Sequence, residues 1–93
     1  MAVVMVMHWP EITLEMYEEA RRRVNWEGDV PDGAVLHVAW VADDGFRVVD
    51  VWESDEQFDR FVRERLMPVV VGELGVKSEP NVTVTPAHAF FKP

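Results

Sequence analysis

Four stretches of the chain carry apolar residues in patterns typical of β-strands. Residues 3–9 and 34–42 are apolar at almost every position, and such continuous runs indicate strands that are covered on both faces. Residues 46–53 and 81–91 are the third and fourth expected strands. Pro86 interrupts the last one, and a proline inside a strand favours an edge position or a bulge.

Two further stretches place apolar residues at helical spacing. Thr13 is a suitable N-cap for the first helix, and Ser54 with Gln57 forms a capping box at the start of the second. Pro68 should end or kink the second helix, because the residue before a proline avoids the helical conformation. For residues 69–75 a short continuation helix is favoured over a strand.

The dipeptide Asp44-Gly45 lies between the second and third strands and predicts a two-residue hairpin turn. Counting outward from this turn places His37 opposite Trp52. Residues two apart lie on one face of a strand, so His37, Asp50 and Trp52 should share a face. The other face of the hairpin is expected to be shielded from solvent, since it carries Leu36, Val38, Trp40, Val49 and Val51.

The expected order is strand, helix, strand, strand, helix, strand, which is the ferredoxin-like βαββαβ arrangement. This α+β fold has a four-stranded antiparallel sheet with two helices on one face. A length of 93 residues fits a single domain over residues 1–93. Because the strands are apolar on both faces and the helices cover only one, a second copy of the chain is expected to cover the other face, which gives a homodimer.

Charge and composition exclude several kinds of partner. Seventeen acidic and nine basic residues give a net charge of −8, which disfavours nucleic acid and anionic membranes. The apolar residues 1–7 lack the basic flank and cleavage site of a signal peptide and are far shorter than a membrane span. The chain has no cysteine, so it forms no disulfide and no thiolate metal site. These features fit a cytoplasmic location, which we expect.

The run VVDVWESDEQFDRFV, with Trp-Glu-Ser followed by Phe58 on the next helix, resembles the dimeric α/β-barrel superfamily. Within that superfamily it is most similar to antibiotic-biosynthesis-monooxygenase-like domains, including small proteins of unassigned function. The resemblance covers the whole chain in length and element order, and about a dozen residues in motif. It implies a barrel-like dimer with a pocket between sheet and helices in each subunit.

The activities implied by this resemblance are cofactor-free oxidation of aromatic polyketides, haem degradation, polyketide cyclisation and aldol-type condensation. In the haem-degrading branch the site combines an Asn on the first strand, the Trp before the second helix, and a His late in that helix. Only the Trp carries over, as Trp52, while His8 stands near the Asn position and no His follows in the second helix. The resemblance therefore argues against haem degradation.

His37, Asp50 and Trp52 form the sharpest candidate site, because they should share one face of the sheet. A carboxylate beside an imidazole fixes its tautomer and raises its basicity, as a general base requires. Trp52 could stack on an aromatic substrate. The alternative is that His37 and Asp50 only satisfy each other inside the sheet, since an unpaired buried charge is costly.

The two other histidines, His8 and His88, lie on strands that should be neighbours. His88 is a second candidate base. With His37 these residues could form a three-histidine metal site, but the superfamily generally uses no metal, and we expect none. Trp26 and Glu27, in the loop after the first helix, could form a lid on the pocket. The alternative is that Trp26 plugs the end of the sheet, and this alternative is favoured. The residues expected to contact a substrate are Trp52, His8, Phe58 and Trp26.

Two functions remain open. The chain has no Gly-rich phosphate loop and no HExxH motif, which disfavours nucleotide-dependent chemistry. The family resemblance implies an activity without a cofactor, and we expect none. The first function is an enzyme that acts on an aromatic or polyketide-like compound by His-assisted proton abstraction, followed by monooxygenation or cyclisation. The second is a non-catalytic ligand-binding or assembly module on the same dimeric fold. A deep apolar cavity with an imidazole in its wall favours the enzyme, and a cavity filled by Phe58 and Phe61 contradicts it.

Overall fold

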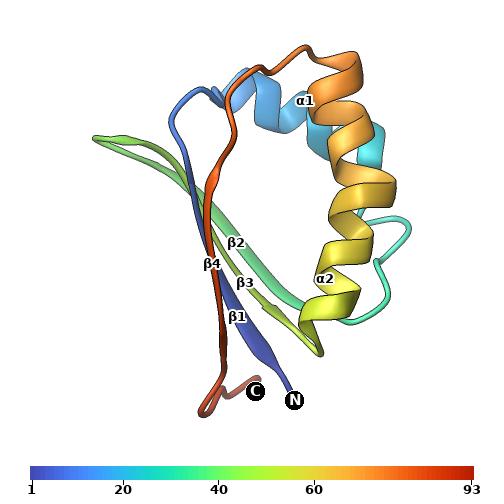
Figure 1. Cartoon of the computed structure of the whole chain (residues 1–93), viewed down its shortest axis with the longest axis vertical. Helices are drawn as coiled ribbons and strands as arrows, with labels where there is room; N and C mark the ends of the chain where they lie inside the picture. The colour runs from blue at the N-terminus through green and yellow to red at the C-terminus, as the bar shows by residue number, and fades with distance from the viewer.

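The apolar run at the N-terminus forms an inner strand of a sheet whose helices all lie on one side (Figure 1). The computed structural model describes residues 1–93. Its elements are β1 (Val3–Trp9), α1 (Leu14–Val24), β2 (Ala34–Ala42), β3 (Gly45–Trp52), α2 (Asp55–Phe61), the π-helices η1 (Val62–Leu66) and η2 (Pro68–Glu73), and β4 (Asn81–Pro86). The strand order is β2-β3-β1-β4, and all neighbouring strands are antiparallel. This confirms the α+β, ferredoxin-like fold.

Both helices begin at the predicted caps. Met16 N donates to Thr13 Oγ1 at 3.1 Å, and Gln57 N donates to Ser54 Oγ at 3.2 Å. These bonds satisfy N–H groups that have no partner in the first turn of a helix. No helix is both long and apolar enough to cross a membrane.

The second helix does not end at Pro68 but continues beyond it in π-helical form. α2, η1 and η2 follow one another, and Pro68 is the first residue of η2. In an α-helix a proline crowds the carbonyl four residues back and cannot donate to it. The wider turns of a π-helix bond five residues back, as Leu74 N does to Val69 O at 2.9 Å, so the chain tolerates the proline. The expected continuation helix over residues 69–75 is present as far as Glu73.

The hairpin turn between β2 and β3 lies one residue earlier than predicted. Ala42 pairs with Gly45, so Asp43-Asp44 is the turn. Gly45 has a φ of 120°, a conformation that glycine adopts easily. His37 therefore faces Asp50 instead of Trp52. The partner has shifted by two residues, which preserves the face of every side chain.

The last strand is shorter than predicted and ends at Pro86, not at residue 91. Pro86 pairs with Val3, the first residue of β1, so no strand lies beyond it to pair with. Ala87 N makes a final bond to Ala2 O at 2.9 Å. His88 consequently lies outside the sheet and is exposed.

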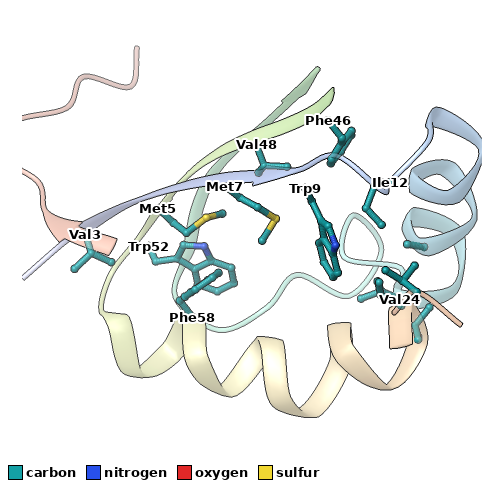
Figure 2. Packing of buried hydrophobic residues seen from close by; sticks show 14 residues of the cluster. Val3, Met5, Met7, Trp9, Ile12, Val24, Phe46, Val48, Trp52 and Phe58 are labelled. Atoms are coloured by element: carbon teal, nitrogen blue, oxygen red, sulfur yellow. The ribbon is translucent and has the colours of Figure 1, made fainter. Parts of the chain in front are cut away.

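The core lies between the sheet and the helices and takes alternate residues from the two inner strands. Figure 2 shows Met5, Met7 and Trp9 of β1 pointing toward the helical layer, with Phe58 of α2 directed back at them. The strand residues of this core are Val3, Met5, Met7, Trp9, Phe46, Val48 and Trp52.

The opposite face of the sheet carries large apolar side chains that one chain leaves in contact with solvent. Val6, Leu36, Val38 and Trp40, which we call the open-face patch, are 41–50% exposed. Val51 on the same face is buried. The expectation of a dry face is therefore met only in part within a single chain.

Candidate active site

A cavity of about 310 Å³ lies between the sheet and the helices. Of the 24 residues that line it, 20 are hydrophobic, so the cavity suits an apolar small molecule with few polar groups. Phe58 and Phe61 stand in its wall and leave it open. The cavity is thus not filled by these two side chains, the outcome that would have contradicted an enzyme.

The wall of the cavity contains an imidazole–carboxylate pair. His37 Nδ1 lies 2.6 Å from Asp50 Oδ1, and Trp52 Nε1 donates to Asp50 Oδ2 at 3.0 Å. β2 and β3 place these side chains together because His37 and Asp50 are directly paired and Trp52 is two residues further along β3. Asp50 is the one charged residue in the core. The structure therefore joins the three residues predicted to share a face.

A tyrosine completes the array. Tyr17 on α1 places its Oη 2.8 Å from His37 Nε2. Asp50 as a carboxylate can only accept, so His37 Nδ1 carries the ring proton and Nε2 of the neutral imidazole is an acceptor. Tyr17 then donates its phenolic proton to His37. A continuous chain of hydrogen bonds runs from Tyr17 through His37 to Asp50.

Aromatic rings hold Tyr17 and His37 in place. The ring centroid of Trp26 lies 5.4 Å from that of His37, in an edge-to-face arrangement, and 5.7 Å from that of Tyr17. The ring centroid of Phe46 lies 5.0 Å from that of Tyr17. Such contacts fix ring orientation. Trp26 is part of the cavity wall and packs directly against the polar array.

The electrostatics of the site keep Tyr17 protonated. Burial raises the pKa of the Tyr17 phenol above its usual value, and the nearby carboxylates of Glu18, Glu27 and Asp50 act in the same direction, while Arg21 opposes them. Glu27 also lines the cavity. Two hydrogen bonds from the Arg21 guanidinium, at 2.5 and 2.9 Å, lower the pKa of the Glu27 carboxyl, so it stays ionised.

The two other histidines lie away from the cavity. His8 points to the opposite face of the sheet and lies opposite Arg47 in the pairing of β1 with β3. Its Nε2 atom lies 2.8 Å from the carbonyl oxygen of Asp44. His88 is exposed beyond the end of β4. The three histidines therefore do not converge, and no group of three or more His, Cys, Asp or Glu side chains is arranged to hold a metal ion.

Tyr17 is the functional candidate that sequence reasoning did not find. It lies on the apolar face of α1, and the sequence pattern predicts that an aromatic residue in this position belongs to the core. One signal was available: Tyr17 is the only tyrosine among ten residues of the aromatic types Phe, Trp and Tyr. A buried hydroxyl requires a hydrogen-bond partner, and the histidine on the sheet face below the helix is a natural one.

Fold and cavity together define a ferredoxin-like α+β protein with a small-molecule pocket between sheet and helices. No protein-family model matches the sequence, and no curated protein matches it. Solved structures do share the fold. A protein of unknown function from Nitrosomonas europaea, NE2512, is similar over 99% of this chain and 93% of its own, with a TM-score of 0.71 and 13% identity.

Two further structures carry names that refer to an activity. SnoaB, a cofactor-independent oxygenase from Streptomyces nogalater, is similar over 99% of this chain and 96% of its own, with a TM-score of 0.62 and 16% identity. An antibiotic biosynthesis monooxygenase is similar over 96% of this chain and 100% of its own, with a TM-score of 0.60 and 15% identity. The chain thus has the fold of the antibiotic-biosynthesis-monooxygenase-like proteins, as the resemblance predicts.

Proposed function

We propose that the protein is a small-molecule enzyme without a cofactor, which removes a proton from an aromatic or polyketide-like compound. The observation that carries this proposal is the His37–Asp50 pair in the wall of a predominantly apolar cavity. An apolar wall binds the rings of such a substrate, and the paired carboxylate stabilises the imidazolium that forms when His37 accepts a proton. The proposal is supported by the similarity in fold to SnoaB, which is a cofactor-independent oxygenase.

Loss of the proton leaves an electron-rich ring system with two possible fates. In monooxygenation the anion reacts with dioxygen at a ring carbon that carries two hydrogens in the keto tautomer. That CH2 group becomes a carbonyl (CH2 + O2 → C=O + H2O), so both hydrogens of the water and all four electrons come from the substrate. In cyclisation the carbanion attacks a carbonyl of the same molecule. Both reactions begin with the same proton transfer, which needs a base and a dry cavity.

The test is turnover of polycyclic phenols in air-saturated buffer, with products identified by mass. His37→Gln should lower the rate by about 10²–10⁴-fold, the usual contribution of a general base. Asp50→Asn should also lower it, because the imidazolium loses its charged partner. Arg63→Gln is the control, since Arg63 lies in an exposed ion pair on η1. No turnover of any compound by a folded wild-type protein would contradict the proposal.

One observation favours the second function, a binding module without catalysis. Both nitrogens of His37 have partners, and no buried side-chain nitrogen or oxygen is left without one. A fully satisfied array can be purely structural. In that case the protein should bind polycyclic aromatic compounds and leave them unchanged, and His37→Gln should alter stability more than affinity.

We propose a homodimer formed through the open-face patch. Four large apolar side chains are exposed together there, and an apolar patch of this kind marks an interaction surface. A second copy of the sheet matches it in shape and polarity, since a two-fold interface brings the same patch together from both subunits.

A further inference from the structure

The hydrogen-bonding capacity of His37 is used up before any substrate arrives. Nδ1 is bonded to Asp50 and Nε2 to Tyr17, at 2.6 and 2.8 Å. An imidazole has only these two polar atoms. A substrate can reach His37 directly only by displacing Tyr17, which the rings of Trp26 and Phe46 hold in position.

The phenol oxygen of Tyr17 has capacity to spare. A hydroxyl offers one donor and two acceptor lone pairs. Its single proton is donated to His37, so both lone pairs remain free, and Tyr17 lines the cavity. A hydroxyl group of a bound molecule can therefore donate to Tyr17 without breaking any bond of the array.

We propose that Tyr17 is a catalytic residue that contacts the substrate and relays its proton to His37. This inference rests on the proposed function and adds to it the group that meets the substrate. The substrate O–H bond breaks as a new O–H bond forms at Tyr17 Oη. The original O–H bond of Tyr17 breaks as an N–H bond forms at His37 Nε2. The products are a substrate oxyanion and an imidazolium paired with Asp50, and no electrons change hands.

The relay restricts the class of substrate. The Tyr17 oxygen accepts hydrogen bonds from O–H donors well and from C–H groups only weakly. The acidic group is therefore a phenolic or enolic hydroxyl, presented to Tyr17 while the rest of the molecule lies in the apolar cavity. Because its raised pKa keeps Tyr17 protonated, Tyr17 always has a proton to pass to His37.

The experiment uses a naphthol and the methyl ether of the same naphthol, which has no acidic proton. Naphtholate absorbance is recorded against pH with the wild type, Tyr17→Phe and His37→Gln. The wild type should lower the apparent pKa of bound naphthol by about one unit or more. Tyr17→Phe should still bind the ether with wild-type affinity, yet lose that shift. His37→Gln should lose it too.

Two outcomes separate the relay from the proposed function. If the shift survives in Tyr17→Phe, the Tyr17 hydroxyl is not needed for the proton transfer, and the relay is wrong while the proposed function stands. If the wild type produces no shift, the proposed proton abstraction is wrong and the relay falls with it.

A measurement on the wild type covers the case in which the Tyr17 variant does not fold. Tyr17 is the only tyrosine, so protein labelled at tyrosine gives one NMR signal for the ring carbon that bears the hydroxyl. Naphthol should move this signal clearly further than the ether, which changes it only through the ring current of its naphthyl group. An equal response to both compounds, or to neither, would overturn the relay.

Discussion

Asp50 joins the parts of the site, because its carboxylate accepts hydrogen bonds from His37 on β2 and from Trp52 on β3. Only 7% of this residue is exposed. A buried carboxylate is costly unless donors compensate it, and these two side chains supply that compensation. The bond from His37 Nδ1 also fixes the tautomer of the imidazole, so one carboxylate contributes both to stability and to the geometry of the candidate site.

We expect Asp50→Ala to lower the free energy of unfolding by about 1–3 kcal/mol, the usual cost of leaving a buried donor unsatisfied. Asp50→Asn should cost less, because the amide oxygen can still accept one of the two bonds. Urea denaturation measures both. Asp59→Ala is the matched control, since Asp59 is in an exposed pair with Arg63 and should stay within about 0.5 kcal/mol of wild type. Equal losses at the two positions would show that Asp50 has no special role.

Tyr17 should give the protein a pH dependence in the alkaline range. Its pKa is raised in the folded protein, so the folded state holds the phenolic proton more tightly than the unfolded chain, whose tyrosine has a pKa of about 10. This stabilisation is complete below about pH 10 and is lost as the pH rises through the folded pKa. Wild type should therefore lose more stability above pH 10 than Tyr17→Phe does. Phenolate absorbance gives the pKa directly, and superimposable stability curves would contradict the prediction.

At the scale of residues, the sequence predicts which face of the sheet a side chain lies on, because side chains alternate between the two faces along a strand. His37, Asp50 and Trp52 were placed on one face by counting in twos, and a two-residue error in register left that face unchanged. Tyr17 was out of reach because its contact depends on how α1 is rotated and positioned over the sheet. His88 was misplaced because β1 is too short to pair with the chain beyond Pro86.

At the scale of elements, the β2–β3 hairpin aligns the site, since its turn decides which residues face each other. Gly45 follows that turn with a φ of 120°. A Cβ atom built at Gly45 would lie 2.8 Å from Pro10 Cα. The position therefore needs glycine for its backbone conformation and for the close approach of the segment after β1.

Gly45→Ala should lower the free energy of unfolding by about 1–3 kcal/mol, the usual cost of holding a side-chain-bearing residue in a strained backbone conformation. Thermal or urea unfolding measures this. Gly72→Ala in η2 is the control, because nothing lies within 4 Å of a Cβ there, and it should stabilise by about 0.5–1 kcal/mol. A neutral effect at Gly45 would mean that the turn relaxes to accept the methyl group.

The number and order of elements were predictable from apolar periodicity and caps, but the path of the second helix was not. Thr13 and Ser54 mark helix starts by local chemistry. Local sequence alone predicts that a helix ends or kinks at Pro68. However, Val69 and Val70, which follow it, are buried in the core. Packing of those valines favours a continued helix, and π-helical turns provide it. Tertiary contacts therefore override the local signal here.

At the scale of the whole molecule, the helices lie over one face of the sheet and leave the other face uncovered (Figure 1). The sequence predicted this imbalance, because the strands are apolar on both faces and two helices can cover only one face of the sheet. The open-face patch is the part of the fold that a second subunit would complete. Association should then add stability that depends on protein concentration.

Val38→Asp should weaken self-association by about 100-fold or more, because it places an unpaired charge in the centre of the proposed interface. Sedimentation or light scattering over a range of concentrations measures the effect. Val71→Asp is the matched control, since Val71 is similarly exposed, 49% against 46%, but lies on η2 rather than on the sheet. A wild-type protein that is monomeric at all concentrations, with the patch in water, would rule out the dimer.

The strand order has a consequence for how the site responds to heat. β2 lies at the edge of the sheet and has only β3 as a neighbour, whereas β3 is an inner strand. Edge strands open locally at a lower free energy than inner ones. Each such fraying event carries the imidazole of His37 away from the carboxylate of Asp50 while the remaining strands stay paired. Warming should therefore separate His37 from Asp50 before the whole sheet unfolds, and a contact that holds the edge of β2 in place should keep the pair together at higher temperature.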